Sequence, residues 1–223
     1  MTERRTLGGI RAAVFDLDGT LFDSVDLWHR IDDEFLGKRG LVATEEYRHG
    51  ISALATREGA VYTARYYRLP DTPEELMEEW AAMARAEYAH SIKLLPFAAE
   101  YLRECKSSGL KLIVVTSLAA ELALPCLKNN GVFELFDEIV TADDCGLSKS
   151  SPEIFIHAAK RVGVEPQECV AFDDVLPALG SAKKAGMTTV AVEGKMLYGK
   201  KAAEFADFVI NDWRFAPRLT IEK

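Results

Sequence analysis

Several features are scarce in this sequence of 223 residues. The cysteines are widely spaced, with no Cys-x-x-Cys pair and no histidine at zinc-ligand spacing; they are Cys105, Cys126, Cys145 and Cys169. We therefore expect reduced thiols and no zinc site. No run approaches the ~18 apolar residues that span a bilayer, and the polar, basic segment 1–11 lacks the apolar stretch of a secretory signal. These absences favour a cytoplasmic protein with no membrane partner.

Positive charge is also in deficit. Lysine and arginine number 27 against 35 acidic residues, so the formal net charge is −8. This sign argues against a nucleic-acid partner, because the phosphate backbone is held by basic surfaces. It does not exclude small anions, since a bound cation or one lysine reverses the sign locally. No apolar stripe is left over for a subunit interface, so we expect a monomer.

Short apolar runs alternate with helical patterns along most of the chain. The runs predict buried strands, and they cover residues 12–15, 112–115, 169–172, 188–192 and 208–210. Continuous apolar runs are typical of parallel sheets covered on both faces. Helices are predicted between the later runs, over residues 101–108, 121–129, 152–161 and 176–185, with Ser151 as the N-cap of the third. This order predicts an α/β fold, a doubly wound, Rossmann-like parallel sheet.

Residues 23–94 interrupt this alternation and contain no clear strand. The segment Thr72-Pro73-Glu74-Glu75 is a capping box with proline in the first helical turn. Apolar residues then recur at near-helical spacing, which we interpret as packing: Leu76, Trp80, Met83 and Tyr88. The sequence thus predicts a core domain of residues 1–22 and 95–223, interrupted by an all-helical cap domain of residues 23–94.

Polar residues stand where three of the predicted strands end. The carboxyl ends of parallel strands share one edge of the sheet, where ligands bind, so these residues should converge: Asp16, Asp18, Thr116, Asp173 and Asp174. Carboxylates crowded at one site repel one another unless a cation is present. Oxygen ligands suit a hard ion, and Mg²⁺ held by carboxylates and a substrate phosphate fits best.

The residue types match phosphoryl transfer. A carboxylate that attacks phosphorus forms an aspartyl-phosphate, once metal and lysine neutralise the phosphoryl charge. A second carboxylic acid can protonate the departing alkoxide and then deprotonate the attacking water. Asp16 meets the first need and Asp18 the second. Thr116 can donate to a phosphate oxygen, and Lys149 can supply a fixed positive charge.

The motifs resemble those of the haloacid dehalogenase-like hydrolase superfamily in order and spacing. They are Asp16-Leu17-Asp18-Gly19-Thr20-Leu21, Val114-Val115-Thr116, Lys149 and Phe172-Asp173-Asp174. The helical insert resembles the cap of the β-phosphoglucomutase-like branch, which includes sugar-phosphate phosphatases. The resemblance implies that the metal is held by Asp16, the Asp18 carbonyl, Asp173 and Asp174. It also implies that Thr116, with Ser117 beside it, and Lys149 hold the phosphoryl group.

Each site residue also has a structural interpretation. An Asp-Gly pair is an ordinary turn signal, and Thr116 or the acidic pair could cap a helix. Lys149 could simply flank a helix in solvent. The complete first motif and the ordered later ones favour the functional interpretation. The sequence departs from the family pattern at loop positions, which leaves substrate preference open: Leu118, Ser150, Val175 and Ala178.

The reaction depends on residues around the core motifs. Dehalogenases of the superfamily lack an aspartate at the position of Asp18, so phosphoryl transfer is favoured. Mutases carry a histidine twelve residues after the nucleophile, where this chain has Trp28. His29 is adjacent, but one helical step turns a side chain by about 100°, so we expect it to face elsewhere. Trp28 resembles the residue in sugar- and polyol-phosphate phosphatases, although helix packing would also explain it.

Three functions are therefore carried forward. The first is a Mg²⁺-dependent phosphatase of small phosphorylated metabolites, with Arg57 as a further substrate-binding candidate. An exposed arginine of no catalytic consequence is the plainer interpretation of Arg57. The second function is a β-phosphoglucomutase-type mutase. The third is a non-catalytic phosphate-binding or interaction protein, against which stands the presence of every charge that turnover needs.

Overall fold

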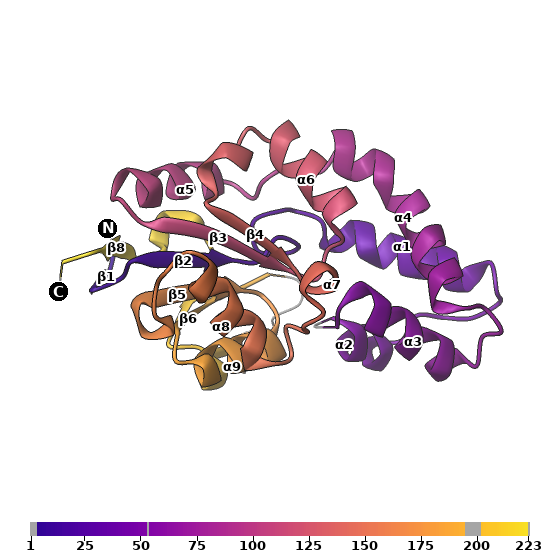
Figure 1. The fold of residues 1–223 in the computed structure, drawn as a ribbon. Helices are drawn as coiled ribbons and strands as arrows, with labels where there is room; N and C mark the ends of the chain where they lie inside the picture. Colours follow the sequence, from indigo (N-terminus) through magenta and orange to yellow (C-terminus); the bar gives the residue numbers. More distant parts are fainter. Residues whose placement is uncertain (1–3, 53, 195–201, 223) are drawn as a thin grey trace.

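The fold is built on a six-stranded parallel sheet. The computed structural model describes residues 4–52, 54–194 and 202–222. The sheet has the order β4-β3-β2-β5-β6-β7, and every neighbouring pair is parallel (Figure 1). Its strands are β2 (Ala12–Phe15), β3 (Lys111–Thr116), β4 (Glu138–Thr141), β5 (Cys169–Asp173), β6 (Thr188–Val192) and β7 (Phe208–Ile210). The predicted doubly wound sheet is confirmed, with β4 added. That strand escaped prediction because it begins with a glutamate and has only two fully buried residues.

Helices cover both faces of the sheet because alternate strand residues point to opposite sides. Phe15 and Val114 pack on the side of α5 (Ala98–Ser107) and α6 (Ala120–Asn129). Val14 and Val115 pack on the side of α8 (Pro152–Arg161) and α9 (Leu176–Ala185). Figure 1 shows these two pairs above and below the strands. The predicted helices are thus confirmed, except that α5 begins earlier than predicted. Ser151 occupies the N-cap position of α8, but its side chain makes no capping hydrogen bond.

Smaller elements complete the α/β part. β1 (Thr6–Gly8) and β8 (Arg218–Thr220) form a separate parallel pair, at the left end of the molecule in Figure 1. The remaining short helices are α7 (Ala142–Cys145), α10 (Ala202–Phe205), η1 (Phe133–Leu135), η2 (Pro166–Glu168) and η3 (Trp213–Phe215). All four cysteines are free thiols, as expected. Within the described ranges, no helix is long and apolar enough to cross a membrane.

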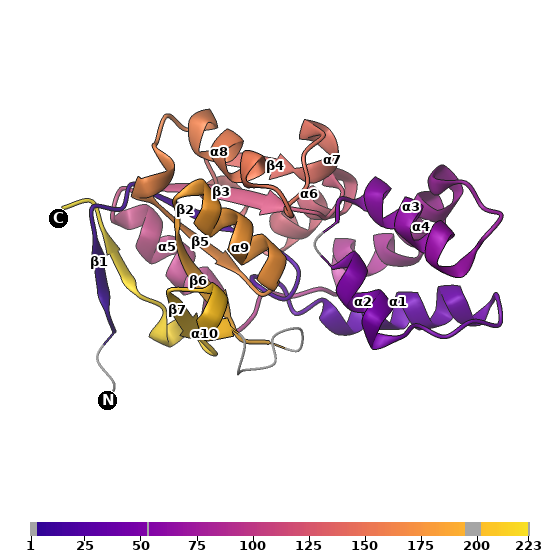
Figure 2. The same ribbon diagram turned by 90° about the horizontal axis from the view of Figure 1, so that it is seen from below.

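Of the helices that the chain forms between β2 and β3, four precede α5 and gather beyond the carboxyl ends of the strands (Figures 1 and 2). They are α1 (Val25–Gly37), α2 (Glu45–Ile51), α3 (Thr56–Tyr67) and α4 (Pro73–His90). The chain leaves and re-enters the α/β part through two adjacent segments, where Phe22 and Leu94 form an antiparallel bridge. Because the two segments are paired there, we propose this bridge as the boundary between core and cap.

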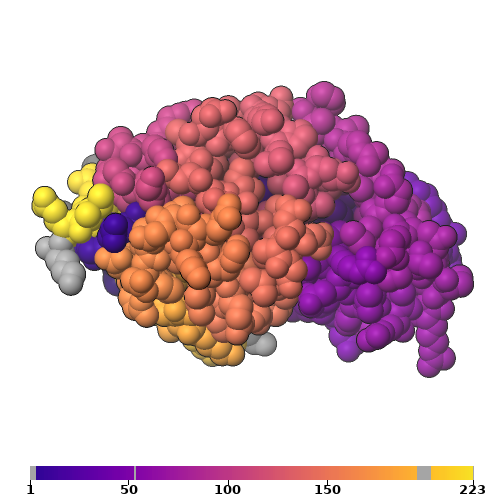
Figure 3. Space-filling model, in the orientation of Figure 1, coloured from indigo at the N-terminus to yellow at the C-terminus, as the bar shows by residue number. Residues whose placement is uncertain are grey.

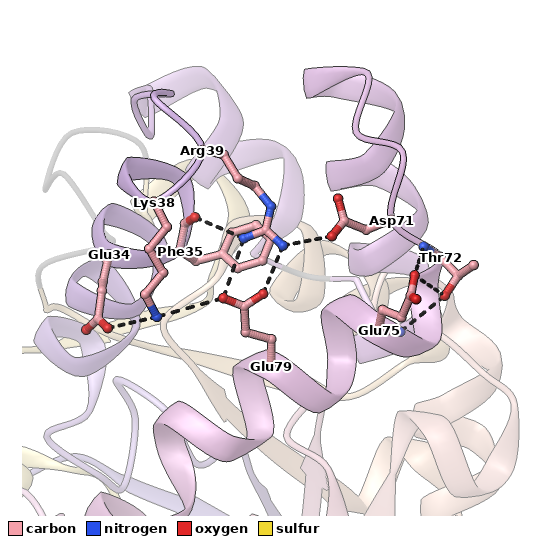
Figure 4. A network of polar contacts seen from close by, with 8 residues as sticks. All are labelled: Glu34, Phe35, Lys38, Arg39, Asp71, Thr72, Glu75 and Glu79. Atoms are coloured by element: carbon pink, nitrogen blue, oxygen red, sulfur yellow. Dashed lines mark hydrogen bonds and ion pairs between the residues drawn. The ribbon is translucent and has the colours of Figure 1, made fainter.

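The capping box predicted for α4 is present. Glu75 N donates to Thr72 Oγ1 over 3.3 Å, and Thr72 N donates back to Glu75 Oε2 over 2.8 Å. Figure 4 shows this box beside a network that ties the end of α1 to α4. In that network Arg39 contacts both Asp71 and Glu79 at 2.8 and 2.9 Å. Its guanidinium also lies 3.9 Å from the ring centre of Phe35. These contacts hold the helices in one arrangement over the sheet edge.

Candidate active site

The strand ends bring the predicted acidic residues together. Asp16 directly follows β2, Thr116 ends β3, and Asp173 ends β5. Because β2 pairs with both β3 and β5, these side chains meet at one edge of the sheet. Each is at most 5% exposed. Topology alone thus explains how residues distant in sequence share one site.

Lys149 joins this group from the turn before α8. Its ammonium lies 2.6 Å from Asp16 Oδ1 and 2.7 Å from Asp173 Oδ2, and the residue is only 3% exposed. Burial alone would lower the pKa of Lys149, but the two carboxylates raise it above its ordinary value. A solvated lysine flanking a helix is therefore excluded. Lys149 is a fixed charge that holds the Asp16 carboxylate in place.

The acidic cluster could hold a metal ion. Asp16, Asp173 and Asp174 each offer one oxygen, and these oxygens lie within 4.8 Å of one another. Burial raises the pKa of Asp173 to about 7, with Lys149 opposing and Asp16 adding to the rise. The pKa of Asp174 is also raised, first by burial and then by the carboxylates of Asp16 and Asp173. One lysine faces three carboxylates, so a divalent, oxygen-preferring cation fits the remaining charge.

Gly19 allows the first motif to approach this cluster. Its φ is +77°, and a Cβ there would lie only 2.1 Å from Asp174 Oδ2. No other residue type fits both the backbone conformation and the space. Thr20 follows and donates from Oγ1 to Asp174 Oδ1 over 3.3 Å. The Asp-Gly turn therefore shapes the carboxylate cluster as well as reversing the chain.

Asp18 faces a separate set of donors. Its Oδ1 accepts from Ser24 Oγ at 2.5 Å and from the hydroxyl of Tyr88. Its Oδ2 lies 3.3 Å from Trp28 Nε1. Burial raises the pKa of Asp18 to about 6, although the hydrogen bonds from Ser24 and Tyr88 oppose the rise. The sequence assigned Tyr88 only to packing; its hydroxyl is the signal that could have suggested a polar role.

A cavity of about 500 Å³ opens beside these groups. In the space-filling view the surface is hollowed where the helices of the cap meet the α/β part (Figure 3). Every predicted site residue except Asp173 lines the cavity. Asp173 lies behind Lys149, whose ammonium contacts it. The Oγ of Ser117 is buried and makes no hydrogen bond to described residues. Thr116 Oγ1 accepts from Leu118 N at 3.0 Å, and a hydroxyl that accepts can also donate its hydrogen to a ligand.

Three cap residues at the cavity differ in what they offer. Trp28 directs its Nε1 to Tyr88 at 2.6 Å, so its N–H is engaged within the protein. Arg57 is at the rim, 61% exposed, and pairs with Glu74 at 2.6 Å. His29, which was expected to face away from the position of Trp28, is also among the residues that line this wide cavity. The cavity is wide enough for two adjacent positions of α1 to contribute to it.

Three of the residues that depart from the family pattern, Leu118, Val175 and Ala178, are compatible with the arrangement of the active-site loops. Val175 N donates to Asp173 Oδ1 at 2.9 Å, a backbone contact that needs no particular side chain. Ala178 is fully buried in α9, where a small residue fits. Leu118 and Val175 present apolar side chains to the cavity. These departures therefore affect the substrate side of the site and leave the carboxylates in place.

Comparisons with known proteins agree with this site. A family model for haloacid dehalogenase-like hydrolases matches residues 10–186. The protein YhcW of Bacillus subtilis is 32% identical over 196 residues, which cover 84% of this chain and 85% of YhcW. Hexitol phosphatase B of Escherichia coli (strain K12) is 28% identical over 186 residues, covering 82% and 83%. The crystal structure of CbbY from Rhodobacter sphaeroides in complex with phosphate has 27% identity and a TM-score of 0.79, covering 92% and 95%.

This chain belongs to the haloacid dehalogenase-like hydrolases. The resemblance drawn from its four motifs is confirmed, as is the prediction of an enzyme in the phosphoric monoester hydrolase class. The non-catalytic alternative loses its support accordingly.

Proposed function

We propose that this enzyme is a Mg²⁺-dependent phosphatase of small phosphate monoesters, with sugar or polyol phosphates as the substrate class. The observation that carries the proposal is the buried Asp16–Lys149–Asp173 arrangement at the base of the cavity. It presents a carboxylate oxygen, a fixed cation and a candidate metal site to the same small volume. The names of relatives that act on hexitol phosphates support the substrate class.

The proposed reaction has two steps. First, a carboxylate oxygen of Asp16 forms a bond to phosphorus while the ester P–O bond breaks. The electron pair of that bond goes to the leaving oxygen, which takes a proton from the Asp18 carboxyl group. Second, water attacks phosphorus and gives its proton to Asp18, and the acyl-phosphate bond to Asp16 breaks. Free phosphate leaves, and Asp16 and Asp18 return to their starting states.

The remaining residues bind and orient the phosphoryl group. Lys149 and the hydroxyl hydrogens of Thr116 and Ser117 would contact its oxygens. Asp16, Asp173 and Asp174, with the Asp18 carbonyl, would hold Mg²⁺. When bound, this ion would neutralise part of the phosphoryl charge. The phosphoryl group is common to all substrates of the class, so we propose that specificity comes from the part of the cavity lined by the helices α1, α3 and α4.

The mutase alternative differs in the acceptor of the phosphoryl group. Trp28 stands where the mutases of the branch have a histidine, and its N–H is already bonded to Tyr88. No proton-accepting group is therefore offered at that position to a sugar hydroxyl. This favours water as the acceptor. Conversion of β-glucose 1-phosphate to glucose 6-phosphate, with a bisphosphate primer, would reverse that preference.

The test uses 4-nitrophenyl phosphate with and without Mg²⁺. We expect metal-dependent phosphate release in the native enzyme and its loss in Asp16→Asn, which removes the nucleophile. Asp212→Asn is the matched control, because Asp212 binds Arg214 on the surface, outside the cavity lining. Full activity in Asp16→Asn would refute the covalent mechanism. A panel of sugar and polyol phosphates then tests the substrate class separately.

A further inference from the structure

The Asp18 carboxyl group is held more firmly on one oxygen than on the other. Oδ1 receives hydrogen bonds from two hydroxyl groups, Ser24 at 2.5 Å and Tyr88. Among the described residues, Oδ2 has one polar contact, the 3.3 Å approach of Trp28 Nε1. An oxygen that already accepts two hydrogen bonds is the poorer place for a mobile proton. The geometry thus distinguishes two oxygens that the sequence treats alike.

Tyr88 is the residue that brings the cap into this arrangement. It is fully buried in α4, 70 positions from Asp18 in the chain. Its hydroxyl accepts from Trp28 Nε1 at 2.6 Å and donates its hydrogen to Asp18. With both partners in place, the direction of the O–H bond is determined. Buried polar groups held by complete networks are rigid, so the carboxyl plane of Asp18 is oriented by a chain that starts at Trp28.

Tyr88 acts on the reaction from outside the cavity. Tyr88 does not line the cavity and so does not touch the substrate. Its influence on the reaction must pass through Asp18.

We propose that Tyr88 is a positioning residue that holds Oδ1 of Asp18, so that Oδ2 is the oxygen that gives the proton to the leaving group. This inference rests on the proposed phosphatase reaction. In the first step the Oδ2–H bond breaks as the P–O bond breaks, and the leaving oxygen takes the proton. Loss of the Tyr88 hydroxyl leaves Oδ1 of Asp18 with one hydroxyl donor in place of two, so the carboxyl group turns more readily and proton donation becomes less efficient.

A series of aryl phosphates isolates this step, since leaving groups of increasing basicity depend increasingly on the proton. The value of kcat/KM covers the steps up to departure of the leaving group. At one fixed pH, we expect Tyr88→Phe to lower kcat/KM for phenyl phosphate by about tenfold, which is part of the roughly 10²–10⁴-fold that general acid–base catalysis contributes. For 4-nitrophenyl phosphate, whose leaving group needs little protonation, the loss should stay below about twofold.

Tyr47→Phe is the matched control. Tyr47 is fully buried in α2, and its hydroxyl shares a 3.0 Å hydrogen bond with Thr63, outside the cavity lining. It loses a buried hydroxyl from the same group of helices, and we expect the same ratio between the two substrates as in the native enzyme. Ser24→Ala removes the other donor to Oδ1 and should change the ratio in the direction of Tyr88→Phe. Thermal unfolding of each variant checks that it is folded.

Equal losses for both aryl phosphates in folded Tyr88→Phe would overturn the inference, and so would a native ratio in Ser24→Ala. Failure of the proposed function has a different signature, because the native enzyme would then release no phosphate from either substrate. The ratio is measured within each variant, so a change in the amount of folded protein does not affect it.

Discussion

Replacing Lys149 with methionine tests how the acidic cluster is balanced. Methionine keeps most of the apolar stem of lysine but removes the ammonium that lies within 2.7 Å of both Asp16 and Asp173. Three buried carboxylates then face one another without a cation of the protein. Removing one partner of a buried ion pair costs about 3–5 kcal/mol. For a chain of this size, 1 kcal/mol corresponds to roughly 2–4 °C in Tm, so a loss of about 4 kcal/mol lowers Tm by roughly 8–16 °C.

Magnesium should restore much of this loss. A ligand that binds only the folded state at about 100 times its Kd adds about 2.7 kcal/mol. We therefore expect Lys149→Met to be strongly destabilised in chelator and to recover more than half of the loss in saturating Mg²⁺. Its catalytic activity should remain lost, because the metal does not replace the contact to the phosphoryl group. Calorimetry should also show tighter Mg²⁺ binding than in the native enzyme, since a competing positive charge is gone.

Thermal unfolding at pH 8, with chelator and with Mg²⁺, measures both effects. Lys183→Met is the matched control, because Lys183 pairs with Asp207 at 2.7 Å while its side chain is 48% exposed. Exposed pairs contribute about 1 kcal/mol or less, and no response to Mg²⁺ is expected. The reasoning is refuted if Lys149→Met unfolds at the same temperature as this control. It is also refuted if Mg²⁺ stabilises the Lys149 variant no more than the native enzyme.

Three further substitutions test other parts of the site. Gly19→Ala should raise the Mg²⁺ concentration needed for half-maximal activity by about tenfold, because the new Cβ would meet Asp174 Oδ2 at 2.1 Å; steady-state kinetics measures this. Burial raises the pKa of Asp32 to about 6, so the folded state retains a proton that the unfolded state releases near pH 4, and stability falls as pH rises through this window. Between pH 4 and 6, the free energy of unfolding of Asp32→Asn should rise relative to that of the native enzyme by up to about 3 kcal/mol, measured by urea unfolding. Arg57→Ala should leave Tm unchanged, because its pair with Glu74 is exposed, while raising KM for any substrate that reaches the cavity rim.

Each of these has a contrary outcome. Gly131→Ala shares the positive φ of Gly19 but would place its Cβ in open space, so an equal effect on Mg²⁺ requirement in both variants would rule out the contact with Asp174. A constant stability difference for Asp32→Asn across pH 4–6 would mean that this carboxyl group does not titrate there. If KM for Arg57→Ala is native for every substrate in the panel, Arg57 is a surface residue.

Local patterns in the sequence predicted the catalytic core well. A strand that is buried on both faces has a continuous apolar sequence, so the strand before Asp16 can be predicted without knowing which strands lie beside it. The capping box at Thr72 is likewise complete within four residues. β4 was missed because its first two residues are only partly buried, so it lacks the continuous apolar run that marks the other strands. The helices α1, α2 and α3 were not separately predicted, although α2 carries a local signal, since Thr44 Oγ1 accepts from Tyr47 N at its N-cap.

Tyr88 and His29 show where local patterns end. Periodicity placed Tyr88 correctly on the buried side of α4, but it does not say what the hydroxyl meets. Its partner, Asp18, comes from a loop 70 residues earlier. Helical geometry turns His29 away from Trp28, but it does not say how wide the cavity is, and His29 is among the lining residues. Both depend on distances between elements, which no short segment of sequence encodes.

The sequence by itself determined the class of chemistry, because Asp16, Asp18, Lys149 and the acidic pair are the residue types that phosphoryl transfer requires, in the order of a known family. Only the tertiary structure decided how they are held. The parallel sheet places Asp16 beside Asp173, the turn before α8 inserts Lys149 between them, and α4 reaches across with Tyr88 to orient Asp18. The physical reason is that charge and hydrogen bonding act over a few ångströms in space, while the groups concerned lie tens of residues apart in the chain.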